Sequence, residues 1–102
     1  MPAPEQSAQQ SAEDAHMCIA FMIAHARTRD IAEAKDAADR TLYHLSQLAK
    51  VIPRTSPLSE KVVRVRAHVN SVRQNLTRQY IPDDIEEILS LARAILNELK
   101  NI

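Results

Sequence analysis

The chain has 102 residues, which is enough for one domain with a single hydrophobic core. It contains no glycine and only 3% aromatic residues, so its composition favours helices joined by short connections and argues against a sheet-rich fold. Its 13 basic and 13 acidic residues cancel, which excludes a strong long-range field that would attract nucleic acid or anionic lipid.

Two features of the N-terminal region bear on the compartment. The single Cys18 cannot form an internal disulfide, and the first residues lack the basic and apolar regions of a secretory signal. The longest continuous apolar run, Met17 to Ala24, has eight residues, whereas a membrane-spanning helix needs roughly 20. We therefore expect a cytoplasmic protein without a membrane segment.

The first half of the chain predicts a tail and two helices. Residues 1–11 mix Pro, Gln, Ser and Ala without hydrophobic anchors, so we expect a flexible tail there and one helical-bundle domain over 12–102. Ser11 resembles an N-cap and predicts a helix over about 12–29. Asp30 with Glu33 is a second capping signal and predicts a helix over 30–52. Because neither Gly nor Pro separates the two stretches, one continuous helix over 12–52 is an alternative.

The second half of the chain predicts a helical hairpin. The segment PRTSP at 53–57 interrupts helix, and Ser56 with Pro57 can start a third helix over about 57–80. Asp83 with Glu86 predicts a fourth helix over 83–102. Apolar residues recur three and four positions apart along both, which indicates a shared core seam. The seam residues are Val62, Val65, Val69, Val72, Leu76, Ile85, Ile88, Ile95 and Leu99. The predicted fold class is all-α, an antiparallel bundle of three to four helices.

The apolar surface of this bundle exceeds what one chain is expected to bury. The run Met17 to Ala24 covers the whole circumference of the first helix for two turns, which a surface helix does not normally show. We expect a homodimer or a partner to cover the excess, with Phe21 as the anchor. The alternative is a first helix buried in the middle of a monomer. The candidate interface residues are Met17, Phe21, Met22, Ile23, Leu89, Leu91 and Leu96.

Motifs for catalysis or cofactor binding are missing from the sequence. Without glycine, phosphate-cradling loops and dinucleotide turns are excluded. The four histidines show no His-x-x-x-His pair, no zinc-type pattern, and no lysine three residues later as in phosphorelay transfer domains. Glu33, Asp36 and Asp39 are expected on a solvated helix face. We predict no catalytic, cofactor-binding or metal-binding residues.

These exclusions favour a non-enzymatic protein–protein interaction module. The predicted function is a small regulatory protein that binds and inhibits or sequesters a partner protein, for example an antiactivator of a transcription regulator. A small chaperone or an immunity-type adaptor is an alternative. An alternative of another class is nucleic-acid binding by the basic third helix, although we expect its charges to pair with the acidic fourth helix. Those charges are Lys61, Arg64, Arg66, Arg73 and Arg78.

Overall fold

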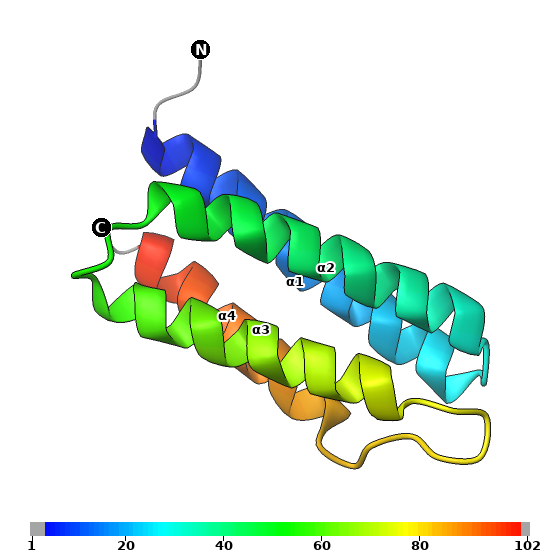
Figure 1. The fold of residues 1–102 in the computed structure, drawn as a ribbon. Helices are drawn as coiled ribbons and strands as arrows, with labels where there is room; N and C mark the ends of the chain where they lie inside the picture. Colours follow the sequence, from blue (N-terminus) through cyan, green and yellow to red (C-terminus); the bar gives the residue numbers. More distant parts are fainter. Residues whose placement is uncertain (1–3, 101–102) are drawn as a thin grey trace.

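The structure, a computed structural model, describes residues 4–100 of the chain as four α-helices (Figure 1). They are α1 (Pro4–Arg27), α2 (Ile31–Val51), α3 (Pro57–Asn75) and α4 (Ile85–Lys100). The helices lie side by side along the long axis of the molecule, and α1 and α3 each pack against both α2 and α4. Within the described residues the fold is therefore an all-α antiparallel four-helix bundle.

A tight turn separates α1 from α2, so the alternative of one continuous helix is wrong. Arg29 adopts a left-handed backbone (φ 63°). The N–H of Asp30 donates to the carbonyl of His25 (2.9 Å), and the N–H of Arg29 donates to that of Ala26 (3.1 Å). This pair of bonds is a Schellman motif, here formed without glycine. The Arg29 guanidinium also donates to the carbonyl of Arg78 (2.9 Å), which ties the turn to the α3–α4 loop.

The left-handed backbone of Arg29 predicts a stability difference between two substitutions. Arg29→Gly and Arg29→Ala both remove the hydrogen bond to Arg78. The difference in stability between the two variants therefore reports only the cost of the backbone conformation at residue 29. We expect the glycine variant to be the more stable by about 1 kcal/mol, because only glycine adopts positive φ without a Cβ clash. Urea unfolding of both variants measures this difference. Equal stabilities would contradict a left-handed residue at this turn.

The starts of α2 and α3 follow from the predicted caps. The Asp30 carboxylate accepts the N–H of Glu33 (3.4 Å), and the Ser56 hydroxyl accepts the N–H of Leu58 (3.2 Å), with Pro57 in the first turn of α3. In each case a side-chain oxygen satisfies a backbone N–H that has no partner within the helix.

The α3–α4 loop is longer than predicted. Helix α3 ends at Asn75 rather than near 80, and α4 begins at Ile85 rather than 83. Leu76 is buried with extended backbone, and beyond it the N–H of Thr77 donates to the carbonyl of Tyr80 (2.9 Å), which closes a turn. Because Leu76 completes the buried seam and Tyr80 is exposed, a further turn of helix would add little burial.

The predicted N-terminal tail is not what the structure shows. Residues 1–3 lie outside the described part of the chain, but residues 4–11 belong to α1, and Ser11 lies inside that helix instead of capping it. Ala8 and Ala12 are only 5% and 3% exposed, and with Ala15 they extend the inward face of α1 at spacings of four and three. Alanine combines the best helix propensity with a small side chain that lets helices approach closely. A search for large hydrophobic residues overlooks such a seam.

The core runs through the centre of the bundle. The predicted seam residues of α3 and three of those of α4 (Ile85, Ile88 and Ile95) are buried, while Leu99 is partly buried and packs against the core. The only buried polar side chain among the described residues is Thr41, whose hydroxyl donates to the carbonyl of Ala37 (2.8 Å). Its hydrogen bond therefore stays within the helix, and the rest of the core is apolar.

Candidate functional site

The apolar run of α1 is divided between the core and the surface. Cys18, Ile19, Met22 and Ile23 are buried, whereas four other residues face outward. Met17 is 51% exposed and Phe21 is 53% exposed. We call the outward set the α1 stripe; it consists of Met17, Ala20, Phe21 and Ala24. Its spacing of three and four residues places all four on one side of the helix.

The position of α1 in the bundle explains this division. Helix α1 packs against α2 and α4, and its inward face consists of small residues followed by larger ones: Ala8, Ala12, Ala15, Ile19, Met22 and Ala26. At 100° per residue this face points away from the α1 stripe. Two neighbours can cover only about half the circumference of a helix, so an all-round apolar run must leave one side in solvent.

Shallow grooves lie on both sides of the α1 stripe. The groove between α1 and α4 has a volume of about 510 Å³, and Ala20, Ala24 and Leu89 contribute to its lining. The groove between α1 and α2 has a volume of about 480 Å³, and Met17 and Phe21 form part of its α1 wall. The stripe therefore lies between two grooves and can be contacted from either side.

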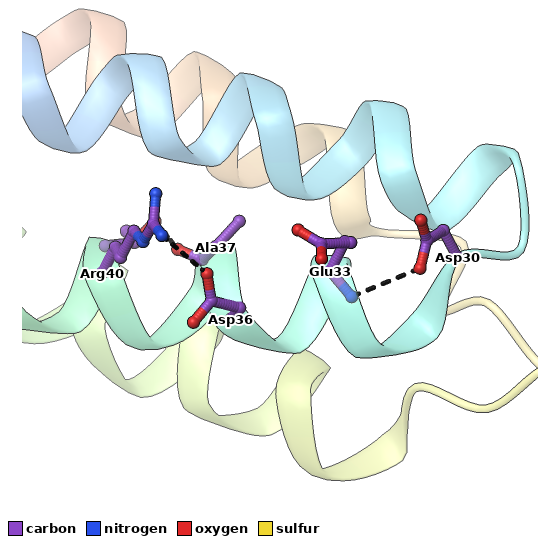
Figure 2. Close-up of polar contacts among 6 residues, drawn as sticks. Asp30, Glu33, Asp36, Ala37 and Arg40 are labelled. Carbon is purple, nitrogen blue, oxygen red and sulfur yellow. Dashed lines mark hydrogen bonds and ion pairs between the residues drawn. The ribbon is translucent and has the colours of Figure 1, made fainter.

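The α2 wall of the second groove is polar. Figure 2 shows Asp36 joined to Arg40 by an ion pair (3.1 Å) and Glu33 donating its N–H to Asp30. Glu33, Asp36 and Arg40 all line this groove. An exposed ion pair one helical turn apart contributes little stability. These charged side chains remain largely exposed on the wall of the groove.

The base of the same groove holds Cys18. This side chain is 7% exposed, and burial raises the pKa of its thiol, an effect that nearby Arg40 opposes. The thiol therefore stays protonated near neutral pH and acts as a small apolar side chain.

The predicted interface residues differ in their exposure in the structure. Met22 and Ile23 are 0% and 7% exposed and belong to the core, whereas the sequence predicts them at an interface; Ile23 also lines the groove between α1 and α4. The reason is the helical period, which turns Met22 and Ile23 about 140° and 120° away from Met17. Leu89, Leu91 and Leu96 of α4 are partly buried and pack against the core. Met17 and Phe21 are the two predicted interface residues that are largely exposed.

One histidine cluster was not expected from the sequence. The Nε2 atom of His68 lies 2.8 Å from a carboxylate oxygen of Asp84, and donor atoms of His68, Asp84 and Glu87 lie within 4.8 Å of one another. These residues come from α3 and from the start of α4, so no sequence spacing indicates them. The cluster could offer three ligands to a cation. Acidic residues at a helix N-terminus are also stabilised by the helix dipole alone, which explains the cluster without an ion.

A second histidine is partly buried. The Nε2 atom of His16 is buried and has no hydrogen-bond partner among the described residues. Burial lowers the pKa of His16, and the positive charge of Arg93 lowers it further. The imidazole is therefore neutral near neutral pH, as expected for a side chain at the boundary of a core.

The basic charges of α3 are divided between different neighbours. Lys61 forms an ion pair with Glu98 of α4, as expected. Arg73 instead pairs with Asp39 of α2, with its Nε 2.7 Å and its Nη2 3.2 Å from the two carboxylate oxygens. The predicted pairing of α3 with α4 alone is thus incomplete, because α3 also contacts α2. Of the arginines proposed for nucleic-acid contact (Arg64, Arg66, Arg73 and Arg78), Arg73 is held by an acidic partner.

The fold and the α1 stripe together describe a helical bundle with an incompletely covered apolar helix. The sequence matches no protein-family model, and neither a curated protein nor a solved structure was found to be similar to it. Across the described residues, no helix combines the length and the apolar character required to cross a membrane.

Proposed function

We propose that this protein is a non-enzymatic protein–protein interaction module, a small regulatory protein that binds and sequesters or inhibits a partner protein. The observation that carries the proposal is the α1 stripe, in which Met17 and Phe21 leave about half of each side chain in solvent. Adjacent exposed apolar side chains on one helix face are typical of sites that bind another chain. An antiactivator of a cytoplasmic transcription regulator is one example of this class.

The form of the stripe suggests how a partner would bind. Two large side chains alternate with Ala20 and Ala24, so a partner helix can approach the backbone of α1 closely between them. The neighbouring grooves carry charges of both signs, including Asp36, Arg40 and Arg27. An amphipathic helix with an apolar face and charged flanks fits these features.

The competing nucleic-acid proposal has less support. Lys61 and Arg73 are engaged with acidic residues, which leaves Arg64 and Arg66 exposed on α3 and Arg78 exposed in the α3–α4 loop. The surface of α3 near Arg64 and Arg66 also carries Val63, which is 59% exposed. These three arginines, one of them outside the helix, supply few of the phosphate contacts that give affinity for nucleic acid. A small chaperone or an immunity-type adaptor would use the same α1 stripe and differs only in the partner.

The test is the substitution Phe21→Glu. We expect it to preserve the fold, because Phe21 is exposed, and to weaken partner binding by about 2 kcal/mol, or roughly 30-fold, because a charge replaces an aromatic anchor. The tagged protein is used to capture partners from a host lysate at moderate salt, with bound protein identified by mass spectrometry and nucleic acid detected by staining. Each captured protein is then purified and titrated calorimetrically with both forms.

Tyr80→Glu is the matched control. Tyr80 is 54% exposed, about the same as Phe21, but it belongs to the α3–α4 loop. This variant should retain full partner affinity. A folded Phe21→Glu variant that binds the partner as well as the unaltered chain would show that the α1 stripe is not the binding surface. Salt-sensitive capture of nucleic acid without protein would favour α3 instead.

A further inference from the structure

We infer that, in the absence of another partner, a second copy of this chain covers the α1 stripe, with the two α1 helices antiparallel and related by a two-fold axis near Ala20. This inference rests on the proposed function, because it assigns an occupant to the same surface. A two-fold contact requires that one surface be complementary to itself. Both the sizes and the charges of the side chains along α1 are self-complementary about a two-fold axis near Ala20.

Side-chain size is the first argument. In an antiparallel pair centred between Ala20 and Phe21, the position numbers of facing residues sum to 41. Met17 then faces Ala24 of the second copy, and Phe21 faces Ala20 of the second copy. Each large exposed side chain meets a small one, so the two helices can interdigitate. In a parallel pair Met17 would face Met17 and Phe21 would face Phe21, which holds the helices apart.

Charge is the second argument. Glu13 lies one turn before Met17, in line with the Ala20 and Ala24 edge of the α1 stripe, and Arg27 lies beside the same edge. Asp14 and His25 lie beside the opposite edge, and none of the four is buried. The midpoint of each pair lies within one residue of Ala20, a displacement of about 1.5 Å along the helix. An antiparallel copy therefore places Glu13 opposite Arg27, as an ion pair, and the Asp14 carboxylate opposite the His25 imidazole, which can donate a hydrogen bond to it, twice each. A parallel copy would place like charges opposite each other, which is unfavourable.

The contacts within one chain leave these groups available. Arg27 pairs with Glu86 of α4, but both side chains are 61% exposed. Asp14 lies 4.0 Å from His44, at the limit of an ion pair. Exposed pairs of this kind contribute little and exchange readily with another partner. Formation of the dimer therefore requires no change in the fold of the bundle.

Sedimentation velocity over a range of micromolar concentrations tests whether the dimer forms. We expect a monomer–dimer equilibrium whose dissociation constant rises at least tenfold in Phe21→Glu and is unchanged in Tyr80→Glu, with circular dichroism showing that both variants are folded. A chain that stays monomeric at several hundred micromolar would overturn the inference. A dimer that is insensitive to Phe21→Glu would also overturn it.

Charge reversal tests the antiparallel arrangement. Glu13→Arg and Arg27→Glu should each weaken the dimer several-fold, because each puts like charges opposite each other. The double variant should restore the affinity of the unaltered chain to within about threefold, because the pair is re-formed with its signs exchanged. Glu86→Gln is the control for loss of the contact between Arg27 and Glu86, and it should leave the dimer intact. If the dimer of the double variant were as weak as the dimers of the single variants, the proposed antiparallel alignment of the two α1 helices would be overturned.

A disulfide tests the position of the two-fold axis. In a Cys18→Ala background, Ala20→Cys should give a covalent dimer under mild oxidation, because residues beside the axis come within disulfide range. Ala67→Cys, at an exposed position of α3, should give no covalent dimer under the same conditions.

The measurements of dimerisation and of partner capture can contradict the two proposals independently. A monomer whose partner capture depends on Phe21 overturns only this inference, whereas a Phe21-dependent dimer whose partner binds regardless of Phe21 supports this inference and overturns the proposed function.

Discussion

Val69→Asp is expected to unfold the bundle. Val69 is 0% exposed at the middle of the α3 seam, within a cluster of buried apolar side chains. An uncompensated buried charge costs about 3 to 5 kcal/mol, which approaches the whole stability of a domain of this size. Helical circular dichroism at 25 °C should fall to the level of an unfolded chain, or the urea midpoint should drop sharply.

Val63→Asp is the matched control for this experiment. It makes the same chemical change in the same helix, but Val63 is 59% exposed. Its stability should lie within about 0.5 kcal/mol of the unaltered chain. Full helical content in Val69→Asp, with an unchanged midpoint, would show that this side of α3 does not face the core.

Met22→Ala is expected to have the second largest effect. Met22 is 0% exposed and lies among the apolar side chains of the core. Truncating a buried methionine to alanine costs about 2 to 5 kcal/mol, through lost burial and the cavity that remains. Urea unfolding should show a lower midpoint with an unchanged slope.

Met17→Ala makes the identical change five residues earlier, on the exposed side of α1. Because Met17 is 51% exposed, its truncation should change the free energy of unfolding by less than about 0.5 kcal/mol. The same variant should weaken any complex formed through the α1 stripe. Equal destabilisation by the two substitutions would contradict the division of the apolar run into an inner and an outer half.

The two proposals for the α1 stripe have a joint consequence. One surface cannot hold a second copy and a partner helix at the same time, so dimer formation and partner capture compete by mass action. The apparent affinity for a partner should therefore fall as the concentration of this chain rises above the dissociation constant of its dimer. Titrations of the partner at two chain concentrations measure this difference.

The sequence alone determined the helical class and much of the interior. The absence of glycine, the seam from Val62 to Leu76 and the break at 53–57 depend on local chemistry and helical period, which do not require knowledge of the neighbours. The caps at Asp30 and Ser56 are equally local, since each uses a side-chain oxygen two or three residues from the N–H that it accepts. Such features can be predicted because they lie within one element.

Only the tertiary structure decided what lies inside and outside α1. An all-round apolar run from Met17 to Ala24 has no polar face to indicate its orientation, so the positions of α2 and α4 select which half is buried. The alanine seam of Ala8, Ala12 and Ala15 becomes visible only against those neighbours, because small side chains give no hydrophobic signal of their own. The pairing of Arg73 with α2 and the cluster at His68 likewise join residues from different helices. Contacts of this kind depend on how the helices are arranged, which the periodicity of a single helix does not contain.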